Sequence, residues 1–166
     1  MWHFNYHLTK HAREKYCKLT PVLEQIRRQE YSCSAAMLRK TFHNLTKEEK
    51  ENVRFNAQVA LKECACSIRK VRENYIRFYA IYWNQTTLLL FPTAILIASV
   101  VKSGHYYMLL IQAILIAMFI LSSKGHANYM TKQLKKLYTT HGYLEAMIES
   151  SDYRNLNHID INRKIY

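Results

Sequence analysis

The sequence predicts an all-α fold: an integral membrane protein with a two-span transmembrane helical hairpin, flanked on the inner side by long amphipathic helices. Only 3 Gly and 2 Pro occur among 166 residues, which is too few turn-forming residues for a many-stranded sandwich or barrel. Two uncharged apolar runs, 81–101 and 106–123, are separated by four residues. The 24 Lys and Arg exceed the 12 Asp and Glu, and all of them lie outside these runs. Together these features predict helices, with a membrane around the middle of the chain.

Residues 1–45 predict an N-terminal basic helical region. Thr20 is a suitable N-cap and Pro21 suits the first helical position, so we expect a helix to begin there. The apolar residues that follow form an irregular stripe, which consists of Val22, Ile26, Cys33, Met37 and Phe42. The stretch 26–42 contains several Arg and few acids, a composition compatible with mitochondrial import.

Residues 46–80 predict an amphipathic helix that leads into the membrane. Thr46 and Glu49 have the spacing of a capping box, and no Gly or Pro follows before the first apolar run. An apolar stripe recurs there at spacings of three and four, and it consists of Ala57, Leu61, Cys64, Ile68, Val71, Tyr75, Phe78 and Tyr82. Lipid headgroups, another helix of this chain or a partner protein could bury this stripe. The small side chains in its first half favour packing against a helix.

The two apolar runs predict a transmembrane hairpin over 81–123. At 1.5 Å per residue, 21 and 18 residues extend about 32 and 27 Å, close to the ~30 Å thickness of the hydrocarbon core. The alternative is a buried hairpin in a soluble bundle, but so short a chain has too little other apolar surface to cover both helices. Pro92 predicts a kink in the first span. Aromatic residues typical of membrane interfaces flank the runs: Tyr79, Tyr82, Trp83, Tyr106 and Tyr107.

Small and polar side chains within the spans predict how the two helices meet. The residues assigned to packing and polar contact are Ala94, Ala98, Ala113, Ala117, Gln112, Thr93 and Ser99. The two alanine pairs have the small-xxx-small spacing that lets helix backbones approach closely. Gln112 is expected to face Thr93, Ser99 or another subunit, as a contact between helices in preference to a pore lining. The spans contain no Asp, Glu, Lys or Arg, which argues against a pump or secondary transporter.

The distribution of basic residues predicts the orientation of the hairpin. Residues 1–80 carry 16 Lys and Arg, residues 124–166 carry 7, and the connector carries only Lys102. Both termini are therefore expected on the cytosolic or matrix side. Residues 124–150 predict a C-terminal helix that Gly142 interrupts, and residues 151–166 lack periodicity and predict an extended tail.

Three histidines near the N-terminus, His3, His7 and His11, are four residues apart. On a helix two neighbours could share one ion, but the first and third are about 12 Å apart along the axis. They are weak metal candidates, and a surface stripe is the preferred interpretation. The four cysteines form no CxxC pair, which is typical of reduced thiols on an inner side. No metal is expected.

The sequence contains no Gly-rich phosphate loop, nucleophile elbow, HExxH motif or paired carboxylates in an apolar setting. We therefore expect no enzyme and no cofactor. The hypothesis is a structural accessory subunit of a multi-subunit membrane complex, with the mitochondrial inner membrane favoured. Its expected partners are other membrane subunits and anionic lipid headgroups, without nucleic acid. The alternative is a self-assembling, two-span homo-oligomeric pore or membrane effector, and a third hypothesis is a soluble nucleic-acid-binding bundle.

Overall fold

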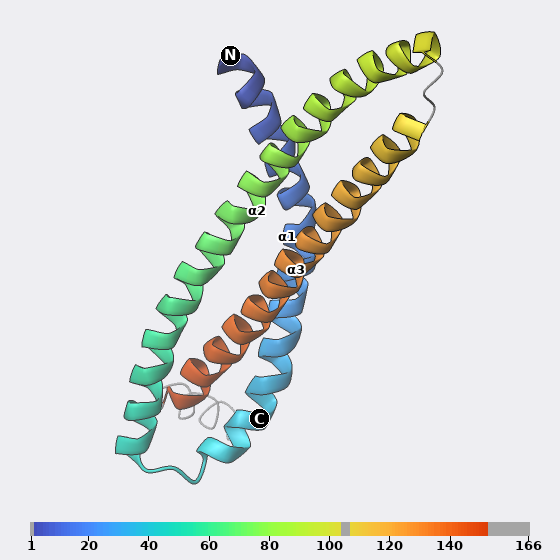
Figure 1. Ribbon diagram of the computed structural model, residues 1–166. Coiled ribbons are helices and arrows are strands. Elements are labelled where there is room, and N and C mark those ends of the chain that lie inside the picture. Colours follow the sequence, from blue (N-terminus) through green and yellow to red (C-terminus); the bar gives the residue numbers. More distant parts are fainter. Residues whose placement is uncertain (1, 104–106, 153–166) are drawn as a thin grey trace, which may run out of the picture. The chain divides into compact units, whose positions relative to one another are not determined.

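The protein is almost entirely helical in the part of the chain that the structure describes. The computed structural model describes the backbone of residues 2–103 and 107–152 and the side chains of residues 10–82, 93–100, 102 and 107–152. These residues form three helices and no strand: α1 (Trp2–Phe42), α2 (Lys47–Ser103) and α3 (Tyr107–Ser151) (Figure 1). The all-α prediction is therefore confirmed. The predicted limits at 80 and 123 fall inside helices, because α2 and α3 each continue unbroken between a polar flank and an apolar run.

Each of the three helices contributes to two compact units. Unit 1 consists of Met1–Lys18 and Val71–Lys132, and it includes both apolar runs. Unit 2 consists of Leu19–Lys70 and Gln133–Tyr166. Within unit 1 the segments of α2 and α3 run antiparallel, as Figure 1 shows.

Unit 2 has an internal apolar core. Leu23 of α1 and Leu134 of α3 are fully buried. A second group of buried side chains, surrounded by half-buried apolar ones, consists of Ala35, Leu38, Phe42 and Ala146. Burial of these side chains removes apolar surface from water, which is the main force that holds such helices together.

The stripe predicted for α1 is only partly correct. Phe42 is buried, but Val22, Cys33 and Met37 are exposed. The inward face passes instead through Leu23, Arg27, Tyr31, Ala35, Leu38 and Phe42. This face has regular helical spacing but includes a charged residue and a phenol, so a search for apolar residues alone misses it.

The helix predicted to begin at Thr20 begins instead at Trp2, and Pro21 lies inside it. A proline within a helix removes one backbone hydrogen bond and costs about 3 kcal/mol. Buried contacts on both sides offset this cost, because Tyr16 is buried in unit 1 and Leu23 in unit 2. Pro21 lies close to the point after Lys18 where α1 passes from one unit to the other.

Gly142 was predicted to interrupt the C-terminal helix, but α3 passes through it unbroken. Gly142 is buried against α1, and a Cβ added to it would overlap the backbone carbonyl of Arg27. The glycine thus serves a close approach between two helix backbones.

The capping box at the start of α2 is confirmed. The backbone N–H and the hydroxyl of Thr46 both donate to Glu49 Oε2 at 2.8 Å, and the Glu49 N–H donates to Thr46 Oγ1 at 3.4 Å. These hydrogen bonds lower the pKa of the Glu49 carboxyl. The side chain of Pro92, where a kink was predicted, lies outside the described residues. The predicted tail beyond residue 152 also lies outside the described chain.

Candidate functional site

The most distinctive surface of unit 1 is the exposed apolar face of its antiparallel segments. Among the described residues, α3 is the one helix that is long and apolar enough to cross a membrane, and none of its most apolar 18-residue window is buried. The large exposed apolar side chains of the two runs, among the described residues, are Ile81, Ile95, Ile97, Tyr107, Met108, Leu110, Ile111, Ile114, Leu115, Met118 and Leu121. A water-soluble monomer rarely exposes so continuous an apolar surface. An exposed apolar surface of this kind is typical of a face that contacts lipid or another protein.

A polar contact joins the two apolar runs inside unit 1. Gln112 Nε2 of α3 donates to Thr93 Oγ1 of α2 at 3.1 Å. Both side chains are half-buried, and Val100, two turns along α2, is buried. The amide of Gln112 therefore has a partner within the same chain, as expected for a polar group that holds two helices together in an apolar environment.

The alanine pairs do not lie between the two runs, contrary to the prediction. Ala94, Ala98, Ala113 and Ala117 are all exposed, and so is Ser99. The contact instead involves Thr93 and Gln112, each one position before an alanine pair. One residue turns a helix by about 100°, so a seam at these two positions directs the alanines away from it.

Aromatic rings lie within unit 1 at the end of the two runs that is marked by Ile81 of α2 and residue 123 of α3. Tyr82 stacks on Phe119 with ring centroids 5.7 Å apart, and Phe78 lies 4.8 Å from the ring of His126. Further in, Tyr75 is buried and meets Tyr16 of α1 edge to face at 6.0 Å. Burial raises the pKa of the Tyr75 phenol, and its hydrogen bond with Tyr79 adds to the rise. These contacts join α2 to α3 and, about two helix turns away, α2 to α1 within unit 1.

The eight residues of the stripe predicted on α2 are all buried or half-buried. In unit 2, Cys64 is buried and its Sγ donates to the backbone carbonyl of Leu137 at 3.4 Å. Burial raises the pKa of this thiol, so it stays protonated and able to donate. In unit 1, Tyr75, Phe78 and Tyr82 make the aromatic contacts above.

Unit 2 also contains ion pairs between helices that the sequence reasoning missed. Arg27 Nη1 lies 2.7 Å from Glu145 Oε1, and the same guanidinium binds Glu24. Glu149 of α3 pairs with Arg39 at 3.0 Å, and Asp152, directly after the end of α3, pairs with Arg54 at 3.7 Å. The signal was available, because Glu145 and Glu149 are four residues apart and so share one face of α3.

The described side chains include one of the three candidate histidines, His11, and all four cysteines. His11 is exposed, and its Nδ1 lies 3.9 Å from Glu14 Oε2. His3 and His7 lie outside the described side chains. All four cysteines are free, and within the described residues no group of three or more His, Cys, Asp and Glu could hold a metal ion.

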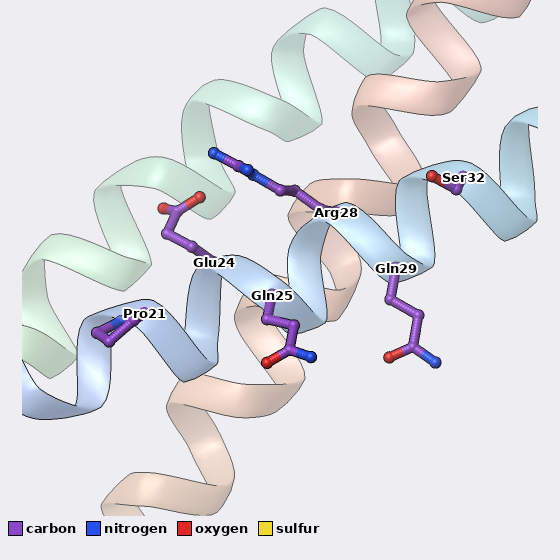
Figure 2. Close-up of a pocket in the computed structure, with 6 residues that line it drawn as sticks. All are labelled: Pro21, Glu24, Gln25, Arg28, Gln29 and Ser32. Carbon is purple, nitrogen blue, oxygen red and sulfur yellow. The ribbon is translucent and has the colours of Figure 1, made fainter.

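A groove of about 640 Å³ lies along the outer face of α1 in unit 2. Figure 2 shows that its six lining residues all come from this helix: Pro21, Glu24, Gln25, Arg28, Gln29 and Ser32. Glu24 is already bound to Arg27, and Gln25 and Gln29 are exposed amides that do not titrate. The groove presents no nucleophile beside a base, so the geometry does not assign it a reaction.

Comparison with known proteins identifies no relative, since no known protein family, no curated protein and no solved structure matches the chain.

Proposed function

We propose that the protein spans a membrane twice, with residues 81–101 and 106–123 in the bilayer and both termini on the inner side. We further propose that it is a non-catalytic accessory subunit of a multi-subunit membrane complex. The Arg-bearing, acid-poor stretch 26–42 favours the mitochondrial inner membrane as its location. The observation that carries the proposal is the apolar surface of α3, whose most apolar 18-residue window contains half-buried and exposed residues but no fully buried one. Lipid and the spans of partner proteins would cover this surface.

The hydrogen bond between Gln112 and Thr93 favours an accessory subunit over a homo-oligomeric pore. A pore would need polar side chains directed toward a water-filled path between copies. The amide of Gln112 is instead held by a hydroxyl of the same chain. The exposed alanines leave two flat helix faces on which the spans of a partner could pack closely.

The first experiment replaces one exposed apolar residue of α3 by lysine. Ile114 is 52% exposed, so Ile114→Lys would be harmless if this surface faced water. At the centre of a transmembrane helix, a lysine costs about 2.5–3.5 kcal/mol of insertion free energy. We expect Ile114→Lys to reduce the fraction of protein that resists alkaline extraction of the membranes. Met37→Lys is the matched control, because Met37 is 59% exposed but lies outside both runs. Release of the wild type by the alkaline wash would contradict the membrane assignment, and equal retention of all three proteins would contradict the placement of Ile114 inside the bilayer.

The second experiment measures the native mass of the detergent-extracted full chain and identifies what accompanies it. An accessory subunit should occur once beside unlike membrane proteins, in a particle larger than its own 19.8 kDa. A ring of identical copies without unlike chains would contradict the accessory role and favour a pore.

A further inference from the structure

The basic charge of the protein is unevenly divided between its units. Unit 2 carries fifteen Lys and Arg against ten Asp and Glu. Unit 1, which contains both apolar runs, has only two acids, Glu14 and Glu73. Its nine basic residues are Lys10, Arg13, Lys15, Lys18, Arg72, Arg77, Lys102, Lys124 and Lys132. The excess positive charge is thus greatest in the unit that the proposed function places in the membrane.

Each helix supplies one of these cations at the inner end of the apolar runs. Lys15 of α1 lies over the ring of Tyr79, with Nζ 4.6 Å from the centroid. Arg77 of α2 is four residues, or about 6 Å, before Ile81. Lys124 of α3 directly follows the second run. We name these three cations the basic collar.

Contacts within unit 1 place the collar cations at one level along the helices. Lys15 contacts the α2 residue two positions after Arg77, and Phe78 packs on His126, two residues after Lys124. All three cations are exposed. Within the described residues none of them forms an ion pair, since the ion pair of unit 1 joins Glu14 to His11.

We propose that the basic collar binds the phosphates of anionic phospholipid headgroups in the inner leaflet. This inference rests on the proposed membrane location. Charge complementarity favours a phosphodiester. Leu121 and Met118 of α3, three and six residues before Lys124, are exposed and offer an apolar surface for the acyl chains of the same molecule. A soluble anion would use only the charge, whereas a phospholipid uses both surfaces.

An aromatic ring holds one cation of the collar, Lys15, in place. A cation over a tyrosine ring is held by the electrons of the ring while its remaining N–H groups stay free to donate. Arg72 repeats the arrangement further inward, with Cζ 5.1 Å from the ring of Tyr16. The long side chains can extend along apolar surface and place their charge at headgroup depth.

The test titrates the full-length protein, purified in an uncharged detergent, with phosphatidylglycerol and with phosphatidylcholine of the same acyl chains. Native mass spectrometry counts the bound lipids and gives an apparent dissociation constant. We expect tighter binding of phosphatidylglycerol, and an affinity about 100-fold weaker in the triple variant Lys15→Gln, Arg77→Gln, Lys124→Gln. Each single replacement is expected to weaken binding about fivefold, so the single variants decide the result if the triple variant fails to fold.

Two control variants test whether lipid binding depends on the collar cations themselves or only on the net charge of the protein. Lys40→Gln, Lys47→Gln, Lys62→Gln removes three exposed cations of unit 2 and should leave the affinity within about threefold, since these cations are far along the chain from the runs. Lys15→Arg, Arg77→Lys, Lys124→Arg keeps the charge and should keep the preference for phosphatidylglycerol. Equal losses in the unit 2 variant, or no loss in the collar variant, would overturn the inference. Displacement of the lipid by an equal concentration of inorganic phosphate would also overturn it.

Alkaline extraction of the same membranes distinguishes failure of this inference from failure of the proposed function. If wild type and collar variant both stay in the membrane but bind phosphatidylglycerol equally, only the inference is wrong. If the wild type is released by the alkaline wash, the membrane location is itself wrong.

Discussion

Unit 2 encloses Leu23 and Leu134, whose side chains are fully buried, whereas unit 1 leaves Leu110 and Leu121 at 66% and 69% exposure. Unit 2 also pairs its charges across helices, as Arg27 does with Glu145 at 2.7 Å. The collar cations of unit 1 form no such pairs within the described residues. Unit 2 thus has fully buried leucines, whereas unit 1 leaves the large apolar side chains of its two runs exposed.

The two units thus differ in what covers their apolar side chains. In water an apolar side chain gains free energy when another helix covers it, so a core forms within unit 2. In a bilayer the lipid covers apolar side chains equally well, and helices associate through close packing and hydrogen bonds. The hydrogen bond between Gln112 and Thr93 belongs to this second kind of contact.

The largest effect that could break this comparison comes from truncating a leucine in each unit. Leu134→Ala removes a fully buried side chain and is expected to lower the free energy of unfolding by about 2–5 kcal/mol. Leu121→Ala removes a side chain that touches little of the protein, so its effect should stay within about 0.5 kcal/mol. Denaturant unfolding in detergent, followed by circular dichroism, measures both. Similar losses would mean that the side chain of Leu121 is covered by protein as fully as that of Leu134.

An intermediate effect is expected from the same replacement at two glycines. Gly142→Ala introduces a Cβ that would overlap the carbonyl of Arg27, and overpacking of this kind costs about 1–3 kcal/mol. Gly125→Ala meets no atom within 4 Å and should stabilise α3 by about 0.5–1 kcal/mol through its higher helix propensity. The melting temperatures of the two variants should move in opposite directions. A stabilising Gly142→Ala would show that α1 and α3 do not approach closely in unit 2.

The smallest effect concerns the start of α2, which belongs to unit 2. Thr46→Ala removes the N-cap hydroxyl and should cost about 1 kcal/mol. Thr140→Ala is the control, because it removes only a bond to the Lys136 carbonyl within α3 and should be nearly neutral.

The same capping box predicts a dependence on pH. Hydrogen bonds from Thr46 lower the pKa of Glu49 below its ordinary 4.5, so the carboxylate stabilises the folded state above that pH. This stabilisation is lost as the pH falls through the lowered pKa of the folded state. The difference in stability between wild type and Thr46→Ala should therefore shrink in acid. A constant difference down to the lowest pH would show that Glu49 does not take part in the cap.

Local signals in the sequence predicted the elements well where neighbouring residues decide the outcome. The capping box needs only Thr46 and Glu49, three residues apart, and it is confirmed. The apolar composition of the run that begins α3 also follows from the order of residues alone. Prediction failed at Pro21, where propensity favoured the start of a helix, and at Gly142, where it favoured an interruption. At both positions contacts with distant residues outweighed the local propensity.

The sequence by itself determined that the chain is helical, that one long stretch of it is apolar enough for a bilayer and that its cations lie outside the apolar runs. Only the tertiary structure decided which face of each helix turns inward. The rotation of a helix depends on contacts made by its partners, so Ala94 and Ala113 turn outward while Thr93 and Gln112 meet. The pairs between Arg27 and Glu145, and between Lys15 and Tyr79, likewise join residues far apart in the chain, and spacing along one helix cannot specify them.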